Sequence, residues 1–256
     1  MKRKLPNTTN KIVPPLAAIL VLLLIWQVVS MTELVPSFML PSPVQVVQAL
    51  IADFPLLLSH AGVTLLETFI GLIIGIIVGF GLAVLMDRFS VIRHALYPLI
   101  VLTQTIPTVA IAPLLVLWFG YEMLPKIILI VLVVFFPIAV NMLDGFRSVD
   151  RDTVSLLRSM GAGDKQIFRY VKFPAALGDF FASLKISVSY AVVSAVISEW
   201  LGGFNGLGVY MTRVKKAYSF DKMFAVIFLI SALSLILMWL VKILQKKCMP
   251  WNNKKG

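Results

Sequence analysis

Residues 155–174 form the longest polar interruption between apolar stretches of the chain, and their side chains suit docking to another protein. The segment contains one acid, Asp164, and four basic residues: Arg158, Lys165, Arg169 and Lys172. Apolar residues recur at helical spacing on both sides of a break at Gly161-Ala162-Gly163. The pattern predicts two short helices outside the bilayer, with Asp164 as the N-cap of the second helix and Pro174 as its end. An apolar face of this pair is expected to be exposed for a partner, and its second half consists of Ile167, Phe168 and Val171.

The same segment resembles the EAA loop of ABC-importer permeases. That signature runs Glu-Ala-Ala, three residues, Gly, nine residues, Ile, one residue, Leu-Pro, and the corresponding positions here are Gly161, Val171, Phe173 and Pro174. The triplet reads Ser155-Leu156-Leu157, so the acidic residue of the signature is missing. In that family the loop is the coupling helix, which docks into a groove on a separate ATPase subunit. The alternative interpretation is an ordinary basic loop between two membrane spans.

The resemblance implies that a coupling hairpin spans residues 151–174. It assigns ATPase coupling to the following residues: Ser155, Arg158, Gly161, Ala162, Gln166, Ile167, Phe168, Val171 and Pro174.

Motifs for catalysis or for nucleotide binding do not occur in the sequence. The stretch from Gly161 to Lys165 does not have the spacing of a phosphate-binding loop, G-x-x-x-x-G-K-[ST], and no other stretch does. His60 and His94 are far apart, and the single cysteine, Cys248, excludes an internal disulfide and a cysteine metal cluster. We therefore expect no enzyme activity, cofactor or metal in this chain. If ATP supplies the energy, a partner ATPase must bind ATP and magnesium.

The composition predicts an all-α integral membrane protein. Of the 256 residues 59% are apolar, whereas soluble domains usually contain about 45–50%. Six segments are long enough to cross a hydrocarbon core of about 30 Å: residues 12–31, 62–86, 95–119, 125–142, 180–201 and 223–244. Glycines at four-residue spacing in the second segment, Gly71, Gly75 and Gly79, predict close packing of that helix against another.

The distribution of lysine and arginine predicts the orientation of these spans. Most of the basic residues lie before the first span, after the second and fourth spans, and after the sixth. The positive-inside rule then places both termini and the hairpin in the cytoplasm. We expect residues 1–11 to form a cytoplasmic N-terminus, residues 12–244 the six-span domain and residues 245–256 a basic tail. This distribution explains the net charge of +11 better than nucleic-acid binding does.

Polar residues within the predicted spans indicate a translocation path. The third span is interrupted by prolines and by the run Gln104-Thr105-Ile106-Pro107-Thr108, and broken helices often line transport paths. The fifth span carries a polar stripe that ends near Glu199. Our candidates for the path are Gln104, Thr105, Pro107, Ser187, Tyr190, Ser194 and Glu199. Three further intramembrane charges, Glu67, Asp144 and Lys185, could serve the gate or the path, or lie at the interface.

A second resemblance narrows the family. Glu199-Trp200-Leu201-Gly202 and Gly206-Leu207-Gly208 before a short amphipathic run, together with Leu40-Pro41-Ser42-Pro43, are similar to the taurine, sulfonate, nitrate and thiamine-precursor branch of these permeases. The resemblance implies a type I ABC importer permease fold in the bacterial cell membrane, in contact with membrane lipid. It also implies three kinds of protein partner: a second copy of the chain or a related permease, a pair of ATPase subunits, and an extracytoplasmic solute-binding protein.

The substrate and two rival functions stay open at this point. The resemblance favours a thiamine-precursor pyrimidine or a similar heterocycle, while sulfonates, taurine and nitrate are alternatives. An ion-driven secondary transporter would require inverted repeats and more buried acids. A membrane-embedded enzyme would require a catalytic cluster.

Overall fold

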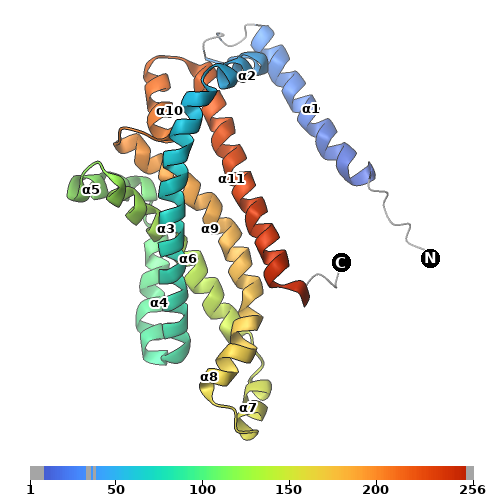
Figure 1. Cartoon of the computed structure of the whole chain (residues 1–256), viewed down its shortest axis with the longest axis vertical. Coiled ribbons are helices and arrows are strands. Elements are labelled where there is room, and N and C mark those ends of the chain that lie inside the picture. Colours follow the sequence, from blue (N-terminus) through green and yellow to red (C-terminus); the bar gives the residue numbers. More distant parts are fainter. Residues whose placement is uncertain (1–8, 33–35, 37–38, 252–256) are drawn as a thin grey trace. The chain divides into compact units, whose positions relative to one another are not determined.

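The computed structural model describes residues 9–32, 36 and 39–251, and these residues form helices and connecting turns without a strand (Figure 1). Residues 1–8 of the predicted N-terminal segment and residues 252–256 of the predicted tail lie outside the described residues. The helices, in chain order, are α1 (Thr9–Met31), α2 (Pro43–Ala52), α3 (Phe54–Arg88), α4 (Ser90–Thr105), α5 (Thr108–Phe119), α6 (Met123–Arg147), α7 (Arg151–Ser159), α8 (Asp164–Ile167), the π-helix η1 (Phe168–Lys172), α9 (Phe173–Leu201), α10 (Leu207–Lys216) and α11 (Phe220–Cys248).

Five helical segments in the described part of the chain are long and apolar enough to cross a membrane, and one bent pair of helices could supply a sixth crossing. The five segments are Val13–Met31, Phe54–Arg88, Met123–Arg147, Asp164–Leu201 and Phe220–Cys248. The bent pair consists of α4 and α5, which meet at an angle of 98°. The prediction of an all-α membrane protein is confirmed, and the number of apolar helices agrees with the six predicted spans if the bent pair counts as one span.

The bend between α4 and α5 has a local cause. Ile106 precedes a proline, which disfavours the helical region for that residue, and its backbone is extended (φ −86°, ψ 121°). Pro107 then serves as the N-cap of α5. The sequence run predicted to interrupt the third span is therefore where the helix breaks.

The chain divides into two compact units. The first contains the residues up to Leu57 together with residues 211–228. In this unit the Trp26 ring lies 5.7 Å from the ring of Phe224, and Lys222 pairs with Asp53 at 2.8 Å. Helix α2 begins with a capping box, in which Ser42 and Gln45 satisfy each other's backbone N–H groups.

The second unit, residues 58–210 and 229–256, contains the candidate site and a core in which α6 packs against α3 and α9. A Cβ atom added at Gly71, Gly75 or Gly79 would lie 2.6 Å from an atom of α6. The predicted close packing of this glycine stripe is confirmed. Gly145 of α6 approaches Ala176 of α9 in the same way, with 2.7 Å between an added Cβ and the alanine Cβ.

The predicted second helix of the hairpin does not end at Pro174. Helices α8, η1 and α9 follow one another without a break, so one helical segment runs from Asp164 to Leu201. A proline inside a helix lacks an N–H group and crowds the preceding turn. The π-turn at Phe168–Lys172 ends two residues before Pro174, and its wider spacing gives the proline ring room.

Candidate functional site

The hairpin, residues 151–174, lies at one end of α6 and α9 in Figure 1. Asp150 caps its first helix, because the carboxylate accepts hydrogen bonds from the N–H groups of Asp152 and Thr153, both at 3.3 Å. The second helix has Gly163, not the predicted Asp164, at its N-cap position, and the Gly163 N–H donates to the side chain of Gln166 at 2.8 Å. Asp164 is the first helical residue, and its carboxylate pairs with arginines instead.

Gly161 ends α7 in a Schellman motif. Its N–H donates to the carbonyl of Arg158, and the N–H of Ala162 donates to the carbonyl of Leu157, both at 2.9 Å. This motif places Gly161 in the left-handed region with φ +87°, which glycine adopts without strain. No atom lies within 4 Å of a Cβ added at Gly161. The backbone conformation, not a close contact, therefore requires glycine at this position.

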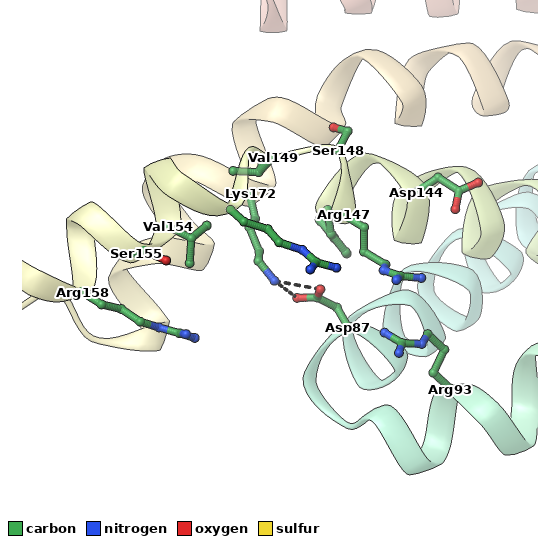
Figure 2. A pocket seen from close by; sticks show the side chains of 12 residues that line it. Asp87, Arg93, Asp144, Arg147, Ser148, Val149, Val154, Ser155, Arg158 and Lys172 are labelled. Carbon is green, nitrogen blue, oxygen red and sulfur yellow. Dashed lines mark hydrogen bonds and ion pairs between the residues drawn. The ribbon is translucent and has the colours of Figure 1, made fainter.

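Two sets of ion pairs join the hairpin to the end of α3. Asp164 binds Arg88 of α3 and Arg158 of α7, the latter at 3.2 Å. All three side chains are more than half exposed, so these pairs orient the turn more than they stabilise it. Lys172 binds both oxygens of Asp87 at 2.8 Å, as Figure 2 shows, and the two side chains are 24% and 11% exposed.

The apolar side of α8 and η1 faces the chain's own helices. Phe168 lies in an aromatic cluster, with its ring centroid 5.1 Å from that of Phe146 and 6.3 Å from that of Phe173. Ile167 is 3% exposed. The predicted exposed apolar face of Ile167, Phe168 and Val171 is therefore wrong for Ile167, which is buried, whereas Phe168 and Val171 are half-buried.

Other apolar side chains of the hairpin are exposed. Leu156 and Met160, four residues apart in the chain at the end of α7, are 62% and 75% exposed, and Tyr170 is 70% exposed. Among the remaining predicted coupling residues, Ser155, Arg158, Gly161 and Gln166 are exposed, whereas Ala162, Val171 and Pro174 are half-buried. Leu156, Met160 and Tyr170 were not among the predicted coupling residues, although the spacing of Leu156 and Met160 could have indicated a shared face.

The predicted path residues fall into two groups. Gln104, Thr105 and Pro107 are exposed at the bend between α4 and α5, and Tyr190 of α9 is 53% exposed. Ser187, Ser194 and Glu199 are buried, and the Ser187 hydroxyl donates to a carbonyl of α6, that of Val134, at 3.4 Å. A side chain must be exposed to contact a solute. In the single chain, only the residues of the first group meet this requirement.

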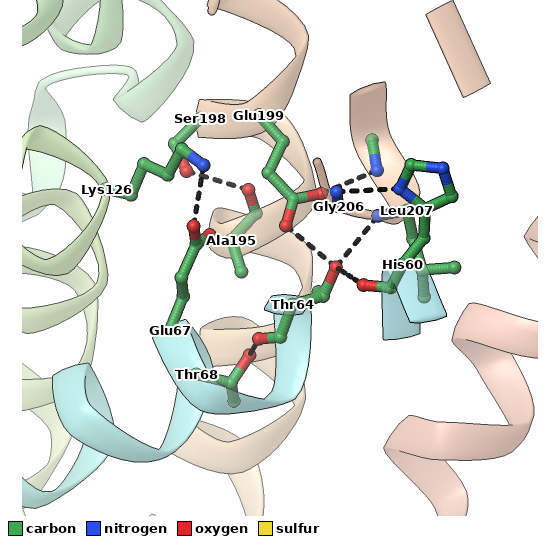
Figure 3. A network of polar contacts seen from close by, with 11 residues as sticks. His60, Thr64, Glu67, Thr68, Lys126, Ala195, Ser198, Glu199, Gly206 and Leu207 are labelled. Atoms are coloured by element: carbon green, nitrogen blue, oxygen red, sulfur yellow. Dashed lines mark hydrogen bonds and ion pairs between the residues drawn. The ribbon is translucent and has the colours of Figure 1, made fainter. Parts of the chain in front are cut away.

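Glu199 belongs to a buried polar network that we call the cap cluster: His60, Thr64, Glu67, Lys126, Glu199 and Gly206–Gly208 (Figure 3). Three consecutive backbone N–H groups at the start of α10 donate to side chains in this cluster. Gly206 donates to His60 Nδ1 at 3.0 Å, Leu207 to Thr64 Oγ1 at 2.9 Å and Gly208 to Glu199 Oε2 at 2.6 Å. Side chains of α3 and α9 thus perform for α10 the role that an N-cap residue usually performs.

The cap cluster leaves no room for other residues at two of its glycines. A Cβ at Gly206 would lie 2.3 Å from the Glu199 carboxyl carbon, and a Cβ at Gly208 would lie 2.3 Å from the Val196 carbonyl oxygen. Gly206 also has φ +127°, in the region that favours glycine. The two glycines therefore allow α10 to approach α9 closely.

Glu67 and Lys126 form a buried ion pair beside these contacts, with 2.6 Å between Oε1 and Nζ and side-chain exposures of 2% and 6%. His60, Thr64 and Lys126 were not identified from the sequence as parts of one site. The polar stripe His60, Thr64, Glu67 and Thr68 on α3 was the available signal. In the described part of the chain, no group of three or more His, Cys, Asp or Glu side chains could hold a metal ion.

Comparison with known proteins supplies the family. Residues 71–249 match the family described as "Binding-protein-dependent transport system inner membrane component". The chain is 37% identical over 242 residues to the formylaminopyrimidine transport permease protein ThiX of Halalkalibacterium halodurans, covering 94% of this chain and 96% of ThiX. It is 38% identical over 227 residues to a probable ABC transporter permease protein of Haemophilus influenzae, covering 89% and 93% of the two chains.

The fold is also similar to that of a solved structure. A chain of the MetNI methionine ABC transporter in an inward-facing conformation superimposes with a TM-score of 0.64 at 20% identity. The similarity covers 78% of this chain and 97% of the MetNI chain.

Proposed function

Because the chain belongs to the family of binding-protein-dependent inner membrane components, the permease subunits of ABC importers, we propose that its hairpin couples solute uptake to a separate ATPase. The protein is a multi-pass inner-membrane transport subunit and not itself an enzyme. The proposal comprises a homodimer, a pair of ATPase subunits that bind ATP and magnesium, and an extracytoplasmic solute-binding protein.

One observation carries the coupling proposal: the helical segment that begins in the hairpin at Asp164 ends beside the cap cluster at Leu201. Its 38 residues correspond to about 57 Å at ~1.5 Å per residue. A displacement of the hairpin by a bound ATPase would be transmitted along α9 to Glu199 and hence to the start of α10. A single continuous helical segment would thus connect the proposed docking element with the opposite end of the bundle.

The docking surface that we propose consists of the exposed hairpin residues. Leu156, Met160 and Tyr170 would supply apolar contact, with Arg158 and Gln166 at the edge. Ser155 occupies the position of the signature's missing acid, so apolar contact and shape would carry more of the docking energy. Ile167, Phe168, Val171 and Pro174 would hold the hairpin on the bundle. Gly161 and Ala162 would set the turn.

For the substrate we propose a formylated aminopyrimidine or a similar small heterocycle. The support is the identity of 37% to ThiX, whose name states formylaminopyrimidine transport. The exposed candidate path side chains, those of Gln104, Thr105 and Tyr190, are neutral hydrogen-bonding groups. They suit a neutral heterocycle better than a sulfonate or nitrate, for which a cation would be expected.

Reconstituted transport tests this proposal. Proteoliposomes that contain the chain and its ATPase, with the binding protein outside, should accumulate radiolabelled formylaminopyrimidine only when ATP is enclosed. Excess taurine should not compete. Accumulation driven by an ion gradient without the ATPase would contradict the coupling proposal, and competition by taurine would contradict the substrate.

A further inference from the structure

A cavity of about 730 Å³ lies between the hairpin and the ends of α3 and α6, and three arginines that line it have no role in the proposed transport cycle (Figure 2). We call it the cationic cavity. It lies among the ends of α3 and α6, the start of α4, α7 and η1. Five basic residues line it, Arg93, Arg147, Arg151, Arg158 and Lys172, against two acids, Asp87 and Asp144.

Three of these cations are not neutralised by the chain. Lys172 pairs with Asp87, and Arg158 pairs with Asp164. Arg93, Arg147 and Arg151 come from α4, α6 and α7, and within the described part of the chain their guanidinium groups have no hydrogen-bond or ion-pair partner. Three guanidinium groups from three helices around one cavity provide convergent donors for a group with several anionic oxygens. A phosphate group has this chemistry, because guanidinium binds it through paired N–H donors.

A neighbouring cavity adds aromatic and aliphatic side chains to the site. It measures about 370 Å³ and shares Arg93, Asp144 and Arg147 with the cationic cavity. Its remaining lining consists of His94, Tyr97 and Pro98 from α4 and Leu143 from α6. The two cavities together present a cationic end next to an aromatic and aliphatic groove, which suits an amphipathic ligand.

The position of the arginines identifies the source of the phosphate. Arg147 is the last residue of α6, a helix apolar enough to span the membrane, and Arg93 lies in the first turn of α4. Basic residues at the cytoplasmic ends of spans lie at the level of the lipid headgroups, and basic pockets there bind anionic headgroups. We propose that the cationic cavity binds the phosphate headgroup of an anionic phospholipid, with the start of an acyl chain along Tyr97 and Leu143.

Native mass spectrometry of the full chain in detergent tests the site. The purified protein is titrated with dioleoylphosphatidylglycerol, with dioleoylphosphatidylcholine, and with inorganic phosphate as a competitor. The double variant Arg93→Gln/Arg147→Gln should bind phosphatidylglycerol at least roughly tenfold more weakly, since each basic residue near a membrane surface contributes appreciably to anionic lipid binding. Phosphatidylcholine binding should not change. Arg151→Gln, on the exposed helix α7, should cause a smaller loss of phosphatidylglycerol binding. This variant replaces the double variant in the test if the double variant does not fold.

The matched control is Lys165→Gln/Arg169→Gln, which removes two exposed cations of the hairpin that line neither cavity. It should leave phosphatidylglycerol binding within about twofold, because distant exposed charges are screened. An equal loss in the control, or no loss in the double variant, would overturn the site. Displacement of the lipid by millimolar inorganic phosphate would assign the cavity to free phosphate. Loss of ATPase association with unchanged lipid binding would assign it to an acidic surface of the ATPase and refute the lipid.

Discussion

Asp164 and Glu199 lie near opposite ends of one continuous helical segment, and each holds a different neighbour. Asp164 binds Arg88 and Arg158 in the hairpin, whereas Glu199 binds Thr64 and the first turn of α10. The two carboxylates therefore fix both ends of the helix that connects the hairpin to the cap cluster. This relationship sets which substitutions should disturb docking and which should disturb the other end of the bundle.

Replacement of Gly161 should uncouple the hairpin from the ATPase. Gly161→Val puts a β-branched residue at φ +87°, a conformation that costs roughly 1–3 kcal/mol for such residues. The turn would rearrange and move Leu156 and Met160. We expect ATP-driven uptake to fall at least tenfold and co-purification with the ATPase to weaken, while the spans still insert.

Two matched variants control this result. Gly163→Ala should be tolerated, because Gly163 has an ordinary φ of −76° and only a distant contact at 3.9 Å. Gly161→Asn should retain most activity, since asparagine tolerates the left-handed region. Full ATPase association and uptake in Gly161→Val would mean that the hairpin is not the docking element.

Glu199→Ala should release the start of α10. The substitution removes the acceptor for the Thr64 hydroxyl, at 2.7 Å, and for the Gly208 N–H. Leaving a buried donor without an acceptor costs about 1–3 kcal/mol, so the thermal unfolding midpoint in detergent should fall. Limited proteolysis near residues 202–206 should accelerate. Glu122→Ala, which removes an exposed carboxylate without a cap hydrogen bond, is the control, and equal effects of the two substitutions would contradict the capping role.

The buried pair of Glu67 and Lys126 should behave as a coupled unit. Lys126→Met alone leaves a carboxylate that is 2% exposed without its cation, a change expected to cost about 3–5 kcal/mol. The double variant Glu67→Leu/Lys126→Met should recover much of that loss. A double-mutant cycle on chemical denaturation measures the coupling, and strictly additive effects would show that the pair contributes nothing as a pair.

Gln104 should contribute to the translocation path. Gln104→Leu removes an exposed amide at the bend between α4 and α5, so uptake should fall several-fold with normal ATPase association. Gln104→Asn, which keeps the amide, should fall less. Initial uptake rates in proteoliposomes measure both, and wild-type rates in the leucine variant would remove Gln104 from the path.

Topology can be tested with single cysteines in a Cys248→Ser background. Asn205 and Lys165 are exposed near opposite ends of the segment from Asp164 to Leu201. If the hairpin and both termini are cytoplasmic, Asn205→Cys should react in intact cells with an impermeant thiol reagent, and Lys165→Cys should react only after permeabilisation. Reaction of both from the outside would contradict the proposed orientation.

The sequence allowed the spans, the break at Ile106-Pro107 and the glycine contact stripe to be predicted, because each follows from a local rule of hydrophobicity or backbone sterics. No such rule indicated that the side chains of Ile167 and Phe168 pack against the chain's own helices. Helical spacing shows that two residues share a face, but only the tertiary fold decides whether that face meets a partner or the chain's own Phe146.

The cap cluster was beyond sequence reasoning for a related reason. Its members come from α3, α6, α9 and the start of α10, so residues 146 positions apart, His60 and Gly206, form one hydrogen bond. Glu199 was singled out as an intramembrane charge, but its function as an acceptor for α10 depends on Thr64 and Gly208 being brought beside it. Pairings of this kind depend on how the helices pack, which a single sequence does not specify.

The glycine stripe of α3 also restricts how the bundle can change shape. At Gly71 and Gly75 the side chains of Ile130 and Val134 occupy the space where a Cβ would lie. If α3 slid along α6, Ile130 and Val134 would no longer face glycines. They would then clash with the side chains of other α3 residues. The two helices should therefore move as a single rigid body, and any switch between inward- and outward-facing states must flex elsewhere. Within the second unit, the Ile106-Pro107 break between α4 and α5 is a non-α segment able to act as a hinge, because its extended backbone interrupts the helix.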